Sequence, residues 1–173
     1  MNWLKNIGKS NKKAGEYQPL PDGWQAPDFT LPAVDGGRLS LSDLKGQPVV
    51  LVFYPEDKSP VCSSQLALYN DALPVFQRYS AQLLGISVDD PQSHREFASQ
   101  MDLKFPLLSD HDPRGEVASL YGVYNVERRV CARALFVIDA QGVIRWSHVS
   151  PPWINPGAGG ILEALESFAE KDS

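Results

Sequence analysis

The sequence predicts an α/β fold in which a central mixed sheet is flanked by helices. Continuous apolar runs at 49–53 and 83–88 have the length and composition of strands buried on both faces. Segments with apolar residues at helical spacing alternate with these runs. Near the end of the chain, two apolar segments are joined by a glycine-containing turn, which is typical of an antiparallel hairpin.

Length and composition are those of one ordinary globular domain. The 173 residues are 43% hydrophobic and 21% charged, so a substantial core is expected without a metal or disulfide. The net charge of −5 excludes an overall basic field for nucleic acid. We expect a basic flexible leader at 1–20 and a folded domain at 21–173. The leader's apolar run is too short for a signal peptide or a spanning helix, so a cytoplasmic location is expected.

The individual elements follow from turn signals and periodicity. The Asp-Gly-Gly turn predicts an N-terminal β-hairpin extension. Pro74 should kink or divide the first long helix. The strands are predicted at 49–53, 83–88, 105–108, 135–138 and 143–149, and the helices at about 60–79, 91–101, 113–121 and 161–168. This order is that of a thioredoxin-like fold.

The most informative stretch is the segment YPEDKSPVC at 54–62. It lies at the carboxyl end of a predicted buried strand, where open α/β sheets place their functional sites. Ser59 is suited to cap the next helix and Pro60 to its first position. Cys62 then falls in the first turn, where the helix dipole and free N–H groups favour an ionised, nucleophilic sulfur. On position alone, a small buried cysteine without chemistry is an equally good interpretation.

Motifs spread over most of the chain favour the reactive cysteine. The pattern P-xxx-S-xx-C at 55–62 is followed by LGISVD, FPLLSD, YGV and RALFVID, and APDF precedes it. In this order the motifs resemble those of the peroxiredoxins, the alkyl hydroperoxide reductase and thiol-specific antioxidant family. The resemblance covers roughly 22–169. Among subgroups, the chain looks closest to the PrxQ (bacterioferritin comigratory protein) and alkyl hydroperoxidase E groups.

The resemblance implies a thiol peroxidase. Cys62 matches the peroxidatic cysteine, whose sulfur attacks the peroxide and becomes a sulfenic acid. Arg133 matches the guanidinium that holds the thiolate, Ser59 the hydroxyl that bonds the peroxide, and Pro55 the ring that shields the sulfur. Further donation is expected from the Cys62 backbone N–H. In simpler interpretations Ser59 is only a helix cap, Arg133 a surface charge and Pro55 a strand terminator.

The same resemblance implies the partners of the reaction. A hydroperoxide is the expected substrate, and thioredoxin or another small thiol is the expected reductant. Relatives are monomers or homodimers, and nothing in the sequence selects one. We expect no membrane or nucleic-acid partner.

Two departures from the family bear on the site. Gln65 stands where many relatives carry Glu, so Arg133 is expected to be less constrained by charge. Ala67 stands where the PrxQ group often has a resolving cysteine. If the strand through Arg133 already includes Cys131, alternation places both on one face, and Cys131 becomes a possible resolving cysteine. The alternative is a one-cysteine enzyme reduced by an external thiol.

Other candidate sites are weaker. His94, His111 and His148 are scattered without zinc spacing and are expected on loops or the surface. Because there is also no phosphate-binding glycine loop, we expect neither a metal nor a cofactor. Two other functions stay open: a thioredoxin-like thiol–disulfide oxidoreductase, which needs two neighbouring cysteines, and a non-catalytic binding module.

Overall fold

The computed structural model describes residues 17–169, so most of the predicted leader lies outside the described part. The strands are β1 (Thr30–Pro32), β2 (Arg38–Ser40), β3 (Val49–Phe53), β4 (Gln82–Ser87), β5 (Leu107–Ser109), β6 (Tyr124–Asn125), β7 (Val130–Cys131), β8 (Arg133–Ile138) and β9 (Ile144–Ser150). The helices are η1 (Leu41–Leu44), α2 (Pro60–Asp71), α3 (Leu73–Gln77), α4 (Pro91–Met101), α5 (Glu116–Leu120) and α6 (Gly159–Ala169).

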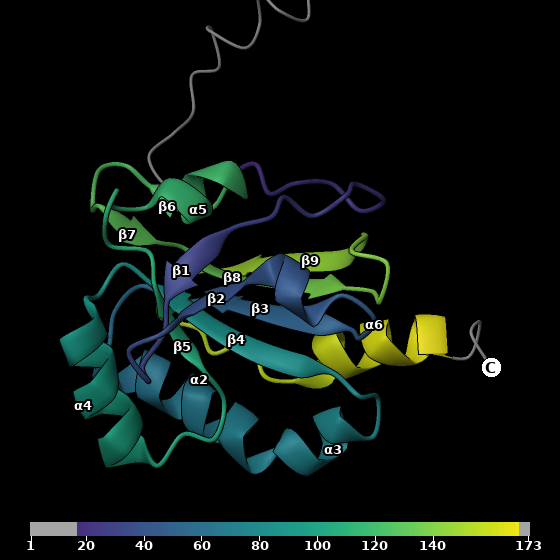
Figure 1. The fold of residues 1–173 in the computed structure, drawn as a ribbon, viewed down its shortest axis with the longest axis horizontal. Helices are drawn as coiled ribbons and strands as arrows, with labels where there is room; N and C mark the ends of the chain where they lie inside the picture. Colours follow the sequence, from purple (N-terminus) through teal and green to yellow (C-terminus); the bar gives the residue numbers. More distant parts are fainter. Residues whose placement is uncertain (1–16, 170–173) are drawn as a thin grey trace, which may run out of the picture.

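A five-stranded mixed sheet in the order β5-β4-β3-β8-β9 forms the centre of the molecule (Figure 1). Strand β3 runs parallel to β4, and β4 runs parallel to β5. Strand β8 lies antiparallel between β3 and β9. Every residue of β3 and β8 is buried, which explains why these strands are continuous apolar runs. The predicted mixed sheet with flanking helices is confirmed.

Different elements cover the two faces of the sheet. Strand β3 sends Val50 and Val52 to one face, where helices α2, α3, α4 and α6 pack over them. It sends Leu51 and Phe53 to the other face, which the β1–β2 hairpin, η1 and α5 cover. Because side chains alternate along a strand, the face of each residue follows from its position. The sheet therefore separates the interior into two apolar clusters.

Helix and strand boundaries agree with the sequence except around 105–121. The predicted long helix is divided as expected, since α2 ends at Asp71 and α3 carries Pro74 in its first turn. Helix α5 is shorter than predicted, because His111 and Arg114 form a bridge in a turn and Gly115 is left-handed. The β6–β7 hairpin, with two residues in each strand, had no recognisable sequence signal.

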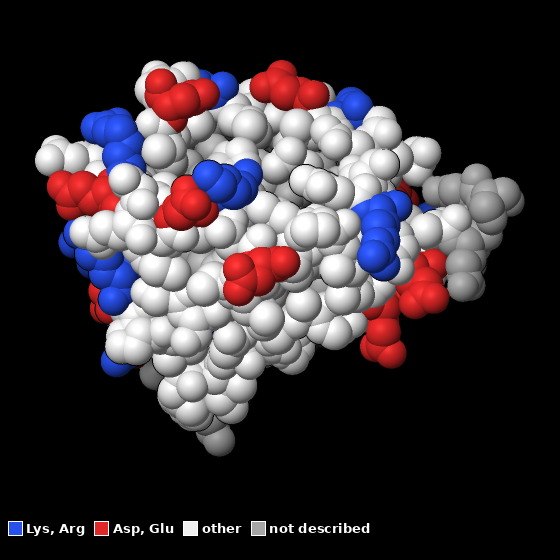
Figure 2. All heavy atoms as spheres, turned by 90° about the horizontal axis from the view of Figure 1, so that it is seen from below, with Lys and Arg blue, Asp and Glu red and all other residues white. Residues whose placement is uncertain are grey.

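The face carrying α2, α3 and α4 shows no block of charge of one sign. Figure 2 views this face from below and shows basic and acidic side chains intermixed among uncharged ones. This distribution agrees with the absence of a basic field in the composition.

None of the described helices has the length and apolar character that crossing a membrane requires.

Candidate active site

Cys62 lies at the start of α2, directly after the loop that follows β3. Ser59 is the N-cap of this helix, and its Oγ accepts a hydrogen bond of 3.2 Å from the Cys62 backbone N–H. Pro60 occupies the first helical position, where its missing N–H costs nothing. The cysteine side chain is fully buried. Its sulfur thus sits in the first turn, at the positive end of the helix dipole.

Arg133 reaches this cysteine because of the sheet topology. It is the first residue of β8, and the register pairs its neighbour Ala134 with Phe53, the last residue of β3. The antiparallel pairing therefore brings the start of β8 to the end of β3 that leads into the Cys62 loop. Arg133 is buried, and its Nη2 lies 3.4 Å from Cys62 Sγ. The structure thus brings together the two residues that the sequence singled out first.

Three further hydrogen bonds fix the guanidinium of Arg133. Its Nη1 donates to Gln65 Oε1 at 2.7 Å, and its Nε and Nη2 donate to the Pro152 carbonyl at 3.1 and 2.8 Å. Gln65 therefore holds Arg133 through a neutral amide oxygen instead of the charge that a Glu would supply. Among the described contacts of Arg133, only Cys62 Sγ can carry a negative charge. The positive charge of Arg133 therefore faces this sulfur without a carboxylate hydrogen-bonded to the guanidinium.

A second layer of hydrogen bonds orients Gln65. Its Nε2 donates to the Tyr69 hydroxyl at 3.1 Å, and that hydroxyl donates to the Gly157 carbonyl at 2.9 Å. Burial raises the pKa of Tyr69 to about 12, so the phenol keeps the proton that it donates. Because the amide nitrogen of Gln65 is engaged by Tyr69, its oxygen must face Arg133.

Ser59 and Pro55 flank the same loop. Because Ser59 Oγ accepts from the Cys62 N–H, its own O–H remains available to donate to a bound molecule. The Cys62 N–H, expected from sequence as a free donor, is already engaged by this cap. Pro55 follows the buried Tyr54 at the end of β3 and is half-buried.

Cys131 lies on the other side of the sheet from Cys62. The strand through Arg133 does not extend to it, because β7 pairs with β6 and the Ala132 N–H donates to the Val123 carbonyl. The alternation that would place Cys131 on the face of Arg133 is thus interrupted. Cys131 packs in the cluster under the β1–β2 hairpin, whereas Cys62 packs in the cluster under α2. Burial raises the pKa of the Cys131 thiol well above its ordinary value.

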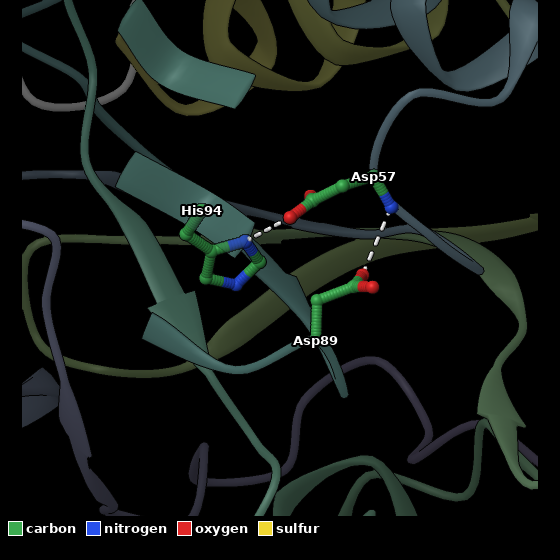
Figure 3. A group of neighbouring side chains, drawn as sticks. All are labelled: Asp57, Asp89 and His94. Carbon is green, nitrogen blue, oxygen red and sulfur yellow. Dashed lines mark hydrogen bonds and ion pairs between the residues drawn. The ribbon is translucent and has the colours of Figure 1, made fainter. Parts of the chain in front are cut away.

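The sequence-based expectation for His94 is wrong. His94 is completely buried in α4, and its Nδ1 lies 2.8 Å from Asp57 Oδ2 (Figure 3). The signal that was missed is spacing: His94 precedes the buried Phe97 by three residues, on the same helix face. Burial raises the pKa of Asp57, but hydrogen bonds from His94, Tyr54 and other neighbours outweigh it and leave the pKa below its ordinary value.

Asp57, Asp89 and His94 are close enough to suggest a metal site, with one potential ligand atom of each within 4.8 Å of the others (Figure 3). Hydrogen bonds within the protein instead link these residues to each other and to their neighbours. Asp89 Oδ2 accepts from the Asp57 N–H at 2.9 Å, and Asp57 Oδ2 accepts from His94. The His94 Nε2 faces the Leu108 carbonyl at 3.0 Å. This arrangement is a hydrogen-bonded cluster whose donors and acceptors match each other.

Comparisons with known proteins identify the family of the chain. The AhpC/TSA family model matches residues 23–147. The chain is 40% identical to the chloroplastic peroxiredoxin Q of Populus jackii over 79% of its own length and 63% of that relative, so it spans less than two thirds of it. It is 37% identical to alkyl hydroperoxide reductase E of Mycobacterium tuberculosis over 75% of this chain and 86% of that one.

A solved structure shows that the similarity extends to the fold. The peroxidoxin BcpB of Mycobacterium tuberculosis superposes with a TM-score of 0.77 at 30% identity, covering 86% of this chain and 97% of that one. The expected resemblance to the peroxiredoxin Q and alkyl hydroperoxide reductase E groups is confirmed. Fold, sequence and the order of the motifs agree, and the chain belongs to the AhpC/TSA family, the peroxiredoxins.

Proposed function

We propose that this chain reduces hydroperoxides with Cys62 as the nucleophile. The observation that carries the proposal is the 3.4 Å contact between Arg133 Nη2 and Cys62 Sγ at the start of a helix. A guanidinium and a helix N-terminus both stabilise negative charge on sulfur. The thiolate is the form that attacks an O–O bond.

The reaction oxidises the sulfur by two electrons. Cys62 Sγ forms a bond to the terminal peroxide oxygen while the O–O bond breaks, giving a sulfenic acid and an alkoxide or hydroxide. The leaving oxygen takes up a proton and departs as alcohol or water. Arg133 N–H groups and the free Ser59 O–H are placed to donate to the oxygens as charge develops on them. Pro55 at the end of β3 would limit the access of water to the sulfur.

We further propose that an external thiol restores the enzyme. The thiol attacks the sulfenic sulfur, forming a mixed disulfide and water, and a second thiol then releases Cys62. Thioredoxin or a small thiol supplies these groups. Cys131 is a poor resolving group because it is buried in the opposite cluster and its pKa is raised. The thiol–disulfide oxidoreductase alternative has no supporting observation, since α2 has no second cysteine.

A cytoplasmic location is also proposed. The chain has two cysteines, too few for the disulfide scaffolds that are common in oxidising compartments. Since one relative is chloroplastic, cell fractionation with an antibody against the chain is the appropriate test. Recovery with an organelle or envelope fraction would contradict this location.

Peroxide consumption by the purified protein tests the proposed function. With dithiothreitol as the reductant, wild type should consume hydrogen peroxide or cumene hydroperoxide and Cys62→Ser should not. The Cys131→Ala variant is the matched control and should keep the wild-type rate. Equal rates for wild type and Cys62→Ser would exclude this mechanism.

A further inference from the structure

The β3–α2 loop, residues 54–59, is joined to helix α4 at two places. Asp57 makes the buried contact, with both its side chain and that of His94 1% exposed. Lys58 and Glu96 make the other contact at 3.0 Å, and these side chains are about half exposed. The two ion pairs connect the same two elements and differ mainly in burial. Solvent weakens the exposed pair far more than the buried one.

Asp57 is held from several directions at once. Its Oδ1 accepts from the Tyr54 hydroxyl at 2.6 Å, and its Oδ2 accepts from the Ser93 hydroxyl and from His94, each at 2.8 Å. Its backbone N–H donates to Asp89 Oδ2. The Tyr54 bond braces the loop internally, and the other bonds fix it to α4 and to the segment after β4.

The surroundings of His94 require a hydrogen on both ring nitrogens. Nδ1 faces the Asp57 carboxylate, and Nε2 faces the Leu108 carbonyl at 3.0 Å, which can only accept. The oxygens of Asp57 also accept from the Tyr54 and Ser93 hydroxyls, so the hydrogen between Asp57 and His94 is assigned to Nδ1 of the ring. His94 and Asp57 therefore form an imidazolium–carboxylate pair inside the protein.

This pair sits a short distance along the chain from the reactive sulfur. Between Asp57 and Cys62 lie only Lys58 in a left-handed conformation, the cap Ser59 and the first residues of α2. Arg133 is fixed independently, by Gln65 and the Pro152 carbonyl. The Cys62–Arg133 contact thus depends on two separate sets of anchors, and the Asp57–His94 pair belongs to the set on the cysteine side.

We propose that His94, as an imidazolium paired with Asp57, is a positioning residue that fixes the β3–α2 loop so that Cys62 Sγ meets Arg133. The proposal rests on the proposed function for its effect on turnover. Its effect on the ionisation of Cys62 stands apart from turnover, because alkylation of a thiolate requires no peroxide.

The test compares variants of the two ion pairs in a Cys131→Ala background, where Cys62 is the only thiol. His94→Gln and Asp57→Asn should each move the pH midpoint of Cys62 alkylation by iodoacetamide upward by roughly one unit. They should also lower kcat/KM for peroxide by about 10- to 100-fold. Glu96→Gln, the matched control on the exposed pair, should keep both wild-type values.

A double variant separates positioning from a general loss of stability. Asp57→Asn with His94→Gln replaces the charged pair by two amides that can bond each other, so neither charge is left unpaired. It should recover part of the midpoint shift and of the lost kcat/KM. The proposal is overturned if the folded single variants have wild-type values, if Glu96→Gln is equally damaging, or if the double variant shows the summed loss.

One measurement on the unmodified protein is independent of these variants. Nitrogen-15 NMR at pH 7 should show hydrogen on both ring nitrogens of His94, and a neutral ring would overturn the proposal. If wild type consumes no peroxide while the single variants still shift the alkylation midpoint, the proposed function fails and the positioning role stands.

Discussion

At the scale of single residues, the geometry of the site depends on the several groups that Arg133 contacts at the same time. Its planar guanidinium donates to an amide oxygen and a backbone carbonyl while Nη2 faces Cys62 Sγ. A Lys ammonium has three donors on a flexible stem and cannot reproduce this fork. The neutral Gln65 leaves the positive charge of Arg133 available to the sulfur. The side chain is thus oriented by neutral acceptors, and its Nη2 lies against Cys62 Sγ.

The variant Arg133→Lys should therefore fold and lose most activity. We expect kcat/KM for peroxide to fall by about 100-fold, because a preset donor to the reacting oxygens is lost. Steady-state peroxide consumption measures the loss, and circular dichroism checks the fold. The exposed Arg38→Lys is the control and should have no effect. A rate within threefold of wild type for Arg133→Lys would show that the charge alone is sufficient.

At the scale of elements, a buried carboxylate lies at the start of α5. Asp110 accepts from the Val117 and Ala118 N–H groups at the start of α5. Burial nevertheless raises the pKa of Asp110 to about 6, from an ordinary value of 3.8. The native state therefore binds the Asp110 proton more tightly than the unfolded chain does. This contribution to stability is complete below pH 4 and is lost as the pH rises through 6.

The pH dependence of unfolding should reveal this group. Relative to Asp110→Asn, the unfolding free energy of wild type should fall by roughly 2–3 kcal/mol between pH 4 and pH 7. Urea denaturation of both proteins at several pH values measures the difference. A difference that stays constant, or that favours wild type more strongly at pH 7, would contradict the assignment.

At the scale of the whole molecule, the sheet keeps the two cysteines apart. Cys62, in the first turn of α2, packs on one face, and Cys131 lies under the β1–β2 hairpin on the other. A disulfide needs Cα atoms within about 7 Å and side chains that point toward each other, so this placement on opposite faces disfavours the pair. The separation of the two cysteines favours a cycle in which an external thiol reduces the sulfenic acid of Cys62.

Oxidised protein should accordingly contain no internal disulfide. After one equivalent of peroxide, mass spectrometry should detect sulfenic acid at Cys62, or a mixed disulfide if glutathione is present, with Cys131 still alkylated only after denaturation. The same treatment of Cys131→Ala is the control and should give the same Cys62 product. A Cys62–Cys131 peptide in the digest of wild type would instead establish the two-cysteine cycle.

The sequence by itself determined the strands β3, β4 and β8, the division of the first helix at Pro74 and the place of Cys62 in a first helical turn. These features follow from local rules: apolar runs, proline geometry and capping. The Cys62–Arg133 pair was expected from the family resemblance. Such features depend on residues that are close together in the sequence, or on motifs that occur in a fixed order along the chain.

Only the tertiary structure decided the face of Cys131, the burial of His94 and the acceptor set around Arg133. The strand break at Ala132 depends on the β6–β7 hairpin, whose two-residue strands have no recognisable sequence signal. His94 is buried because Asp57, remote in sequence, supplies the charge that offsets its desolvation. Contacts between segments far apart in the chain fixed these positions, and local sequence patterns do not specify such contacts.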